Sequence, residues 1–251
     1  MIDLSGKRAL VTGGSRGIGG AVSRLLAQCG ADVAVHYRSR RADAEAMVAT
    51  VKSMGRRAMA IAAELSDRAA VDQACAAVAD AWGGIDIFVG NAGIWPADDV
   101  PVVEMDDDRW ARTMRENVDG MFFSTRAALR HMCDGGRVVL VSSTAGQRGE
   151  SLHADYGASK GAMISFVKSV AIEVAVRGIT VNSVAPGWVD TEMCEAPFAG
   201  AGRARIAGAI PVGRIATPDD IAFPIVCLCA PQARHVTGEI VNVNGGSVLC
   251  G

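Results

Sequence analysis

The sequence has little of several features that mark particular classes of protein. Only 5% of its residues are aromatic, and its formal net charge is -2 at pH 7. Such a chain offers no basic surface for nucleic acid or an anionic membrane, and few rings on which bases could stack. Its longest apolar stretch, 221–230, is too short to span a bilayer and contains Pro224. We therefore expect no nucleic-acid partner and no membrane partner.

The seven cysteines also lack the spacings of a metal site. Cys227 and Cys229 are separated by one residue within an apolar run, which suits buried thiols better than a ligand pair. No secretory signal precedes Lys7 and Arg8. We expect no bound metal and a reducing, cytoplasmic setting.

Half of the 251 residues are hydrophobic, and apolar runs rich in β-branched residues alternate with longer alanine-rich segments. Alternating strands and helices predict βαβ units and a parallel sheet covered on both faces. No linker and no internal repeat interrupts this pattern, so we predict one α/β domain over 1–251 with a doubly wound sheet of about seven strands. The predicted strands are 9–11, 33–35, 58–61, 85–89, 138–141, 179–184 and 240–243, and the predicted helical segments include 21–29, 42–54, 69–82 and 108–132.

A glycine-rich loop directly follows the first predicted strand and opens a helix. Residues 12–19 read TGGSRGIG. Gly13, Gly17 and Gly19 would permit a tight turn, close approach of a phosphate and close packing of the helix. The N-terminus of that helix would offer free N–H groups to a pyrophosphate. The loop therefore predicts a dinucleotide site, with a purely structural turn as the alternative.

The end of the second predicted strand bears on which dinucleotide is bound. Folds that bind NAD usually place an acidic side chain there for the ribose 2′-OH, and here Tyr37 stands in its place. Arg38 and Ser39 follow, and Arg16 lies in the glycine-rich loop. Guanidinium groups suit a 2′-phosphate, so we expect NADP(H), with NAD(H) still possible. The alternative is that 38–41 is a solvated basic turn.

Tyr156 and Lys160 lie four residues apart, on one face of a predicted helix. An ammonium about 4 Å from a phenolate stabilises it by roughly 4 kcal/mol at an effective dielectric constant near 20. That energy would lower the pKa of Tyr156 from about 10 toward 7, where acid–base catalysis is efficient. Alone, the pair is more simply read as two surface residues.

Several further motifs accompany this pair, and together they resemble the short-chain dehydrogenase/reductase family over essentially the whole chain. The resemblance implies a fold of the Rossmann type and hydride transfer between a nicotinamide cofactor and a carbonyl or alcohol. The motifs are the glycine-rich loop, NAG at 91–93, Asn117, Ser142-Ser143, YGASK at 156–160, Pro186-Gly187 and VNGG at 243–246.

The resemblance assigns the catalytic residues. It makes Tyr156 the proton donor, Lys160 its activator and ribose ligand, and Ser143 the group that meets the carbonyl, while Ser142 is the structural alternative. Asn117 would hold a water that links Lys160 to solvent. Glu64 stands where the family usually has aspartate near the adenine. The cofactor-binding residues implied are Gly13, Ser15, Arg16, Gly17, Ile18, Gly19, Tyr37, Arg38, Ser39, Glu64, Leu65, Asn91, Ala92, Gly93, Tyr156, Lys160, Pro186, Gly187, Val189 and Thr191.

The overall pattern is most similar to 3-oxoacyl-[acyl-carrier-protein] reductases, which implies an acyl thioester substrate and a possible carrier-protein partner. Arg126 and Arg130 could dock an acidic carrier, but Ile172 stands where those enzymes commonly have arginine. That departure favours the alternative, a dehydrogenase of a sugar, polyol or other secondary alcohol. A third reading is a binding protein that senses NADP without catalysis.

The same resemblance predicts a mobile substrate lid at 192–210 and a homotetramer assembled through two helices. We expect His153 at the mouth of the substrate pocket, and Trp95 either beside the substrate or in packing. The predicted substrate pocket comprises Trp95, Ser143, His153, Trp188 and Met193.

Overall fold

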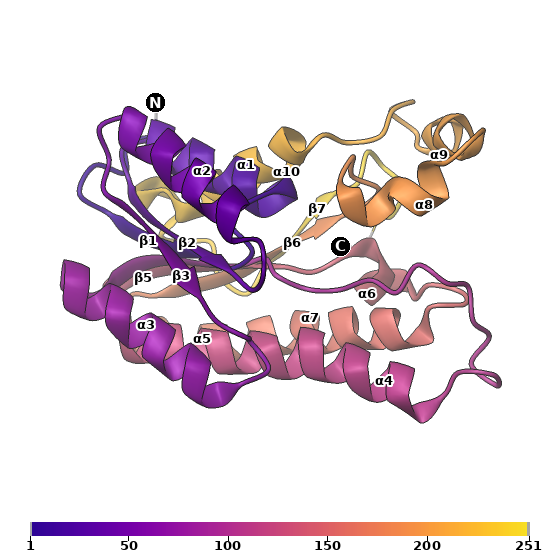
Figure 1. Ribbon diagram of the computed structural model, residues 1–251, viewed down its shortest axis with the longest axis horizontal. Coiled ribbons are helices and arrows are strands. Elements are labelled where there is room, and N and C mark those ends of the chain that lie inside the picture. Colours follow the sequence, from indigo (N-terminus) through magenta and orange to yellow (C-terminus); the bar gives the residue numbers. More distant parts are fainter. Residues whose placement is uncertain (1, 250–251) are drawn as a thin grey trace.

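A twisted parallel sheet forms the centre of the molecule (Figure 1). The computed structural model describes residues 2–249. Its strands pair in the order β3-β2-β1-β4-β5-β6-β7, which confirms the predicted doubly wound α/β fold. The direction of winding reverses between β1 and β4, the position at which such sheets bind ligands beyond their carboxyl ends. The strands are β1 (Arg8–Val11), β2 (Asp32–Tyr37), β3 (Ala58–Ala62), β4 (Ile85–Gly90), β5 (Met132–Val141), β6 (Thr180–Pro186) and β7 (Ile240–Val243).

Helices cover both faces of the sheet. One face carries α1 (Gly17–Gln28), α2 (Arg41–Ser53) and α10 (Pro218–Cys229), and the other carries α3 (Arg68–Trp82), α5 (Gly120–Arg130) and α7 (Ala154–Val174) (Figure 1). Each face of the sheet packs against its helices in a separate hydrophobic core. Successive strand residues point into opposite cores, since side chains alternate across a strand. Val11 packs into the first core, whereas Leu10 and Phe88 pack into the second.

The helical segment predicted at 108–132 is not one continuous helix. It consists of α4 (Asp107–Met114), a π-helical turn η1 (Arg115–Asp119) and α5. Strand β5 then begins at Met132, six residues before the predicted start, and its pairing with β4 shifts register between Ile85 and Ile87. Asp134, Gly135 and Gly136 lie in that irregular part of the strand, which explains why no apolar run marked it.

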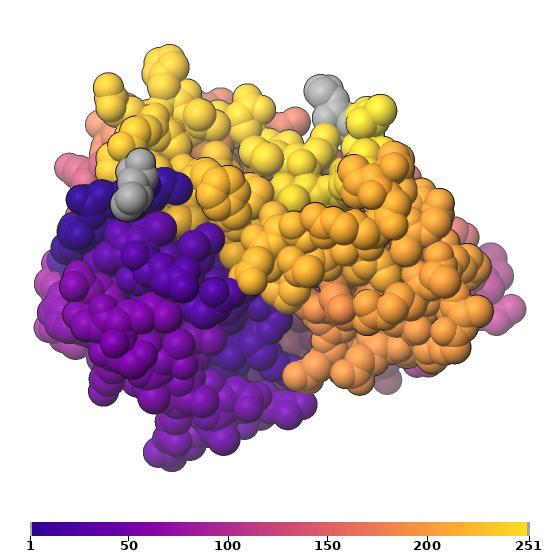
Figure 2. Space-filling view, turned by 90° about the horizontal axis from the view of Figure 1, so that it is seen from above, coloured from indigo at the N-terminus to yellow at the C-terminus, as the bar shows by residue number. Residues whose placement is uncertain are grey.

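Short helices follow β6 and form a small layer near the carboxyl ends of the strands. Phe198 and Ile206 are buried there with Ile210, and Trp188 packs against them. In Figure 2 the orange part of the chain that includes these helices lies beside the yellow C-terminal part. This segment covers the predicted lid, and its elements are η3 (Glu192–Cys194), α8 (Glu195–Phe198) and α9 (Gly202–Ala209); the remaining elements of the fold are α6 (Thr144–Arg148), η2 (Ala175–Arg177) and η4 (Pro231–Ala233).

Over residues 2–249 no helix is both long enough and apolar enough to cross a membrane. In the same range, no cluster of three or more histidine, cysteine or acidic side chains could hold a metal ion. The cysteines of that range are all free thiols, and Cys250 lies outside the described residues.

Candidate active site

Lys160 is buried at the base of the site, with 4% of its surface exposed. Its ammonium donates a hydrogen bond to the carbonyl oxygen of Val141 at the end of β5, at 2.9 Å. Burial lowers the pKa of Lys160 to about 8. The remaining two donors of this ammonium have no protein acceptor among the described residues, so they are free for ligand hydroxyls.

Tyr156 lies one turn earlier on α7, and the Lys160 ammonium is 5.8 Å from the centre of its ring. Burial raises the pKa of Tyr156 above its ordinary value of 10, and a hydrogen bond with Ser143 only partly opposes this rise. The predicted lowering of this pKa by Lys160 is therefore wrong for the chain without a ligand. The prediction counted the attraction between the two charges and left out the cost of burying a phenolate.

Ser143 follows β5 and caps α6. Its hydroxyl accepts a hydrogen bond from the backbone N–H of Ala145 at 3.1 Å, and it lies beside the Tyr156 hydroxyl. Its neighbour Ser142 instead points into the sheet, where it donates to the carbonyl oxygen of Val184 and accepts from Ser183. Of the two serines, only Ser143 reaches Tyr156.

Asn117 sits in the π-helical turn, 1% exposed. Its amide oxygen accepts from the backbone N–H of Ile94 at 2.8 Å, and its amide nitrogen donates to Ser159 at 3.0 Å. A side chain at Gly93 would come within 3.0 Å of this amide and 3.5 Å of the Lys160 ammonium. Asn117 thus joins the loop after β4 to α7 beside Lys160, and its role in holding a water stays a prediction.

The glycine-rich loop fits a pyrophosphate. Gly13 and Gly17 adopt φ values of +60° and +53°, which side-chain-bearing residues rarely adopt. A Cβ at Gly19 would lie 2.2 Å from the carbonyl oxygen of Gly13, so the helix packs on the loop only with glycine there. No side chain caps α1, which leaves the first N–H groups of that helix available to an anion.

Asn91 and Ala92 shape this loop from the neighbouring strand β4. The Asn91 amide donates to the carbonyl oxygens of Thr12 and Gly13, at 3.0 and 3.3 Å. The backbone N–H groups of Asn91 and Ala92 both donate to the Thr12 hydroxyl. The Asn91 side chain therefore holds the glycine-rich loop in place. This supporting role differs from the predicted direct contact of the NAG motif with the adenosine.

The predicted phosphate-binding arginines pair with carboxylates in this structure. Arg38 contacts Glu116 at 2.7 Å and Glu64 at 3.6 Å. Arg16 and Arg40 both contact Glu192, the first residue of η3. The basic turn at 38–41 thus faces Glu192 at the start of the predicted lid. Arg40, which was not among the predicted cofactor residues, lies with Arg16 at this contact.

The other predicted cofactor residues lie around the glycine-rich loop or pack in the two cores and at the ends of the strands. Thr191 lies over the loop, and its methyl group would be 3.5 Å from a Cβ added at Gly17. Gly187 packs against Asn244. Val189 is buried and bridges to Ala216. Ile18 and Tyr37 pack on the first core and Leu65 on the second; Ser15 is half-buried beside α1, Ser39 is exposed after β2, and Pro186 ends β6.

An aromatic wall borders the predicted substrate side. The ring of Trp95 stacks on His153 with centres 4.7 Å apart and meets Trp188 edge-on at 6.0 Å, and Trp188 in turn contacts Phe198. His153 is 3% exposed and belongs to this wall, and its place at the mouth of a substrate pocket stays a prediction. Met193 is 46% exposed, whereas the next residue, Cys194, is close enough to influence Tyr156.

Sequence reasoning missed Glu150, Cys194 and Phe198, which the fold brings to this wall. Glu150 hydrogen-bonds to the Trp95 side chain, and burial raises its pKa. A glutamate in a polar loop, and a phenylalanine in a short helix, carry no sequence signal of their own. Their only clue was proximity in sequence to His153 and to the predicted lid.

Together these features define a nucleotide-binding oxidoreductase fold with a tyrosine–lysine–serine site, and comparisons with known proteins agree. Residues 13–247 match the family described as "Enoyl-(Acyl carrier protein) reductase". The chain is 37% identical over 250 residues to 3-oxoacyl-[acyl-carrier-protein] reductase FabG of Vibrio cholerae, covering 99% of this chain and 100% of that one. It is 36% identical to sorbitol dehydrogenase of Cereibacter sphaeroides, covering 97% and 98%.

A solved structure of a short chain dehydrogenase from Burkholderia cenocepacia, in complex with NADP, is similar with a TM-score of 0.91 and 39% identity, covering 97% of this chain and 98% of that one. The chain belongs to the short-chain dehydrogenase/reductase family of oxidoreductases, which act on carbonyl and alcohol groups. The resemblance in its motifs is confirmed.

Proposed function

We propose that this protein reduces a ketone to a secondary alcohol with NADPH, and that 3-oxoacyl thioesters are its substrate class. The observation that carries the proposal is the group formed by Tyr156, Ser143 and Lys160 beside the glycine-rich loop. Tyr156 and Ser143 present two hydroxyls side by side where a carbonyl oxygen could accept from both. Among residues 2–249, Lys160 is the only lysine whose ammonium lies next to this pair of side chains.

In this mechanism the protein supplies orientation and a proton. A bound NADPH would supply the hydride. Ser143 donates to the substrate carbonyl and polarises it, and Tyr156 gives its proton to the oxygen as negative charge develops there. Lys160 holds ribose hydroxyls with its free donors, and the Asn117 amide fixes the loop and helix between which the ammonium lies. The raised pKa keeps Tyr156 protonated at neutral pH, the state that reduction requires.

The basic residues at the end of β2 support a preference for NADPH. Arg16, in the loop, and Arg38 and Arg40, after β2, have side chains that are about half exposed, and the acid that would repel a 2′-phosphate is replaced by Tyr37. The Burkholderia relative was solved with NADP. Guanidinium groups bind phosphate oxygens in bidentate fashion, and this geometry favours the phosphorylated cofactor.

Substrate access would be controlled by residues 192–210. These short helices have few apolar anchors, chiefly Phe198 and Ile206, and they meet the aromatic wall through Trp188. Elements held by little buried apolar surface open at low cost. We propose that this segment is the substrate lid and that the wall receives the acyl chain.

A second candidate is oxidation of a sugar, polyol or other secondary alcohol. Glu150 supports it, because a carboxyl group beside Tyr156 could accept hydrogen bonds from substrate hydroxyls. The sorbitol dehydrogenase relative is nearly as similar as the carrier-protein reductases. Docking of a carrier protein is weakened by Ile172, 79% exposed on α7, and by Arg126, whose guanidinium stacks on Phe122 at 4.7 Å.

We further propose a homotetramer in the cytoplasm. Phe122 on α5 and Ile172 on α7, with Val176 beyond its end, expose apolar surface that a second copy would cover. The free thiols suit a reducing compartment.

Initial rates with NADPH and NADH against acetoacetyl thioesters, diketones and sugars test the function. Tyr156→Phe should lower kcat by about 100-fold or more while leaving NADPH binding nearly unchanged, since it removes only the proton donor. Lys160→Met should lose activity as well, whereas Lys168→Met, exposed on the same helix, should not. Wild-type activity retained in Tyr156→Phe would refute the proposed site, and faster turnover with NADH would refute the cofactor preference.

A further inference from the structure

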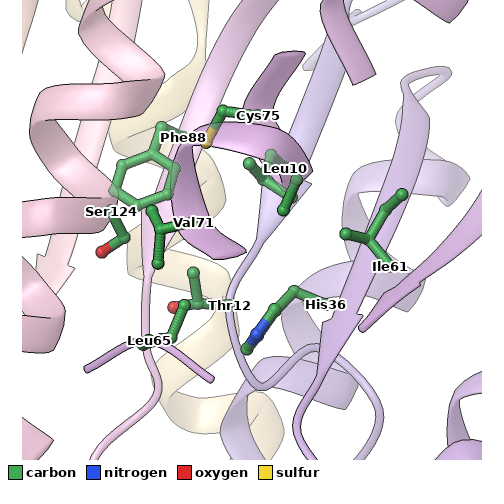
Figure 3. Close-up of a pocket in the computed structure, with 10 residues that line it drawn as sticks. Leu10, Thr12, His36, Ile61, Leu65, Val71, Cys75, Phe88 and Ser124 are labelled. Atoms are coloured by element: carbon green, nitrogen blue, oxygen red, sulfur yellow. The ribbon is translucent and has the colours of Figure 1, made fainter. Parts of the chain in front are cut away.

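His36 is a buried histidine that belongs to none of the roles described so far. It lies near the carboxyl end of β2 and is 3% exposed. Its ring lines a narrow pocket with Thr12, which directly follows β1, and Leu65 from the segment after β3 (Figure 3). A buried polar ring needs a reason to be there, because each of its nitrogens costs free energy if left unpaired.

Both ring nitrogens have backbone partners. The N–H of Gly13, in the glycine-rich loop, donates to Nδ1 at 3.1 Å. The other nitrogen, Nε2, lies 3.1 Å from the carbonyl oxygen of Ala63, which directly precedes Glu64 and Leu65. A backbone N–H can only donate and a carbonyl oxygen can only accept. The ring must therefore be neutral, with its proton on Nε2.

The backbone of His36 takes part in the same connection. Its carbonyl oxygen accepts from the N–H of Gly14 at 3.0 Å, so side chain and backbone together hold two successive loop residues. Asn91 restricts the loop from the other side, because a Cβ added at Gly13 would lie only 3.1 Å from the Asn91 amide. The position of the Gly13 peptide is therefore defined from one side by Asn91 and from the other by His36.

We propose that His36 is a positioning residue that ties the glycine-rich loop to the segment after β3, and so sets the geometry of the dinucleotide site. The proposal rests on the proposed function, since it takes the loop to hold the pyrophosphate and the segment at 64–65 to border the adenosine. The tie works only while the imidazole is neutral. A second proton would turn Nδ1 from an acceptor into a donor that faces the Gly13 N–H.

The groups around the ring determine where it gains that proton. Burial lowers the pKa of His36 below its ordinary value of 6.5, and the carboxylate of Glu64 partly opposes this. Glu64 is itself shared with Arg38 at 3.6 Å. Cys75 of α3 lines the same pocket, and burial raises its pKa to about 12, so it stays neutral. A lowered pKa means that folding favours the neutral ring, so the tie is intact above pH 6.5 and is lost only as pH falls through the lowered pKa of the folded protein.

Three substitutions separate the two hydrogen bonds. His36→Asn places an amide oxygen near the position of Nδ1 and keeps an acceptor for Gly13. His36→Gln places its amide near Nε2 and keeps only the bond to Ala63, and His36→Leu keeps neither. At pH 7.5 we expect His36→Gln and His36→Leu to bind NADPH about 5- to 100-fold more weakly than wild type, because the buried Gly13 N–H is left unpaired. His36→Asn, which loses only the bond to Ala63, should bind NADPH more weakly than wild type and more tightly than the other two variants.

The dependence on pH distinguishes positioning from simple support of the fold. NADPH dissociation constants are measured by fluorescence titration from pH 8 down to the lowest pH at which both wild type and His36→Asn remain folded. Wild type should lose more affinity toward low pH than His36→Asn does, and comparing the two at each pH cancels the titration of the 2′-phosphate itself. Thermal unfolding at each pH identifies any variant that fails to fold, and His36→Asn then still tests the proposal.

Equal pH profiles for wild type and His36→Asn, or undiminished binding by a folded His36→Leu, would overturn the proposal. Wild type that binds neither NADPH nor NADH at any pH would instead refute the proposed function.

Discussion

Replacing Glu192 with glutamine should strengthen NADPH binding and leave NADH binding unchanged. The Glu192 carboxylate contacts Arg16 and lies 3.5 Å from Arg40, two of the basic residues proposed to face a 2′-phosphate. A bound phosphate must therefore draw the same guanidinium groups away from a carboxylate. NADH has no such phosphate and meets no such competition.

The size of the effect follows from exposure. The Arg16 side chain is 44% exposed and that of Glu192 is 55% exposed, so solvent screens the pair strongly. Exposed pairs contribute about 0.2–1 kcal/mol each, so two of them give about 0.4–2 kcal/mol. At about 1.4 kcal/mol per tenfold change, NADPH should bind roughly 2- to 30-fold more tightly to Glu192→Gln.

Fluorescence titrations of both cofactors at low and high salt check this expectation. The gain should shrink in high salt, because exposed charges are screened there. Glu195→Gln is the matched control, since Glu195 lies on the same segment and forms no ion pair within residues 2–249. Weaker NADPH binding by Glu192→Gln, or an equal gain for NADH, would refute the reasoning.

Two further predictions concern pH and packing. Burial raises the pKa of Tyr156, so alcohol oxidation, which needs the phenolate, should accelerate steadily above neutral pH; reduction, which needs the proton, should not accelerate over the same range, and identical profiles in both directions would contradict this. Gly19→Ala should destabilise the protein by about 1–3 kcal/mol in thermal unfolding through its clash with Gly13, whereas Gly208→Ala in α9, with open space around it, should stabilise by up to about 1 kcal/mol.

The sequence was sufficient to predict the sheet and the residues around Tyr156, because periodic apolar runs and spaced motifs are local signals. It could not reveal that Arg16 pairs with Glu192, since 176 residues separate them and only the fold brings them together. The tie between His36 and Gly13 was hidden for the same reason. The pKa of Tyr156 was predicted in the wrong direction because burial is a property of the folded environment, and two letters of sequence do not report it.

The π-helical turn at Arg115–Asp119 separates tolerance of the fold from tolerance of the site. A π turn holds one residue more than an α-helix of the same length, so losing a single residue there would leave a regular helix joining α4 and α5. Because the π turn already absorbs the extra residue, the residues before and after the deletion would keep their relative orientation and that helix would still pack. Only the side chains within the turn would change direction. Asn117 would then leave Ile94 and Ser159. A one-residue deletion in this turn should therefore leave the fold intact and still remove the link between the loop after β4 and α7.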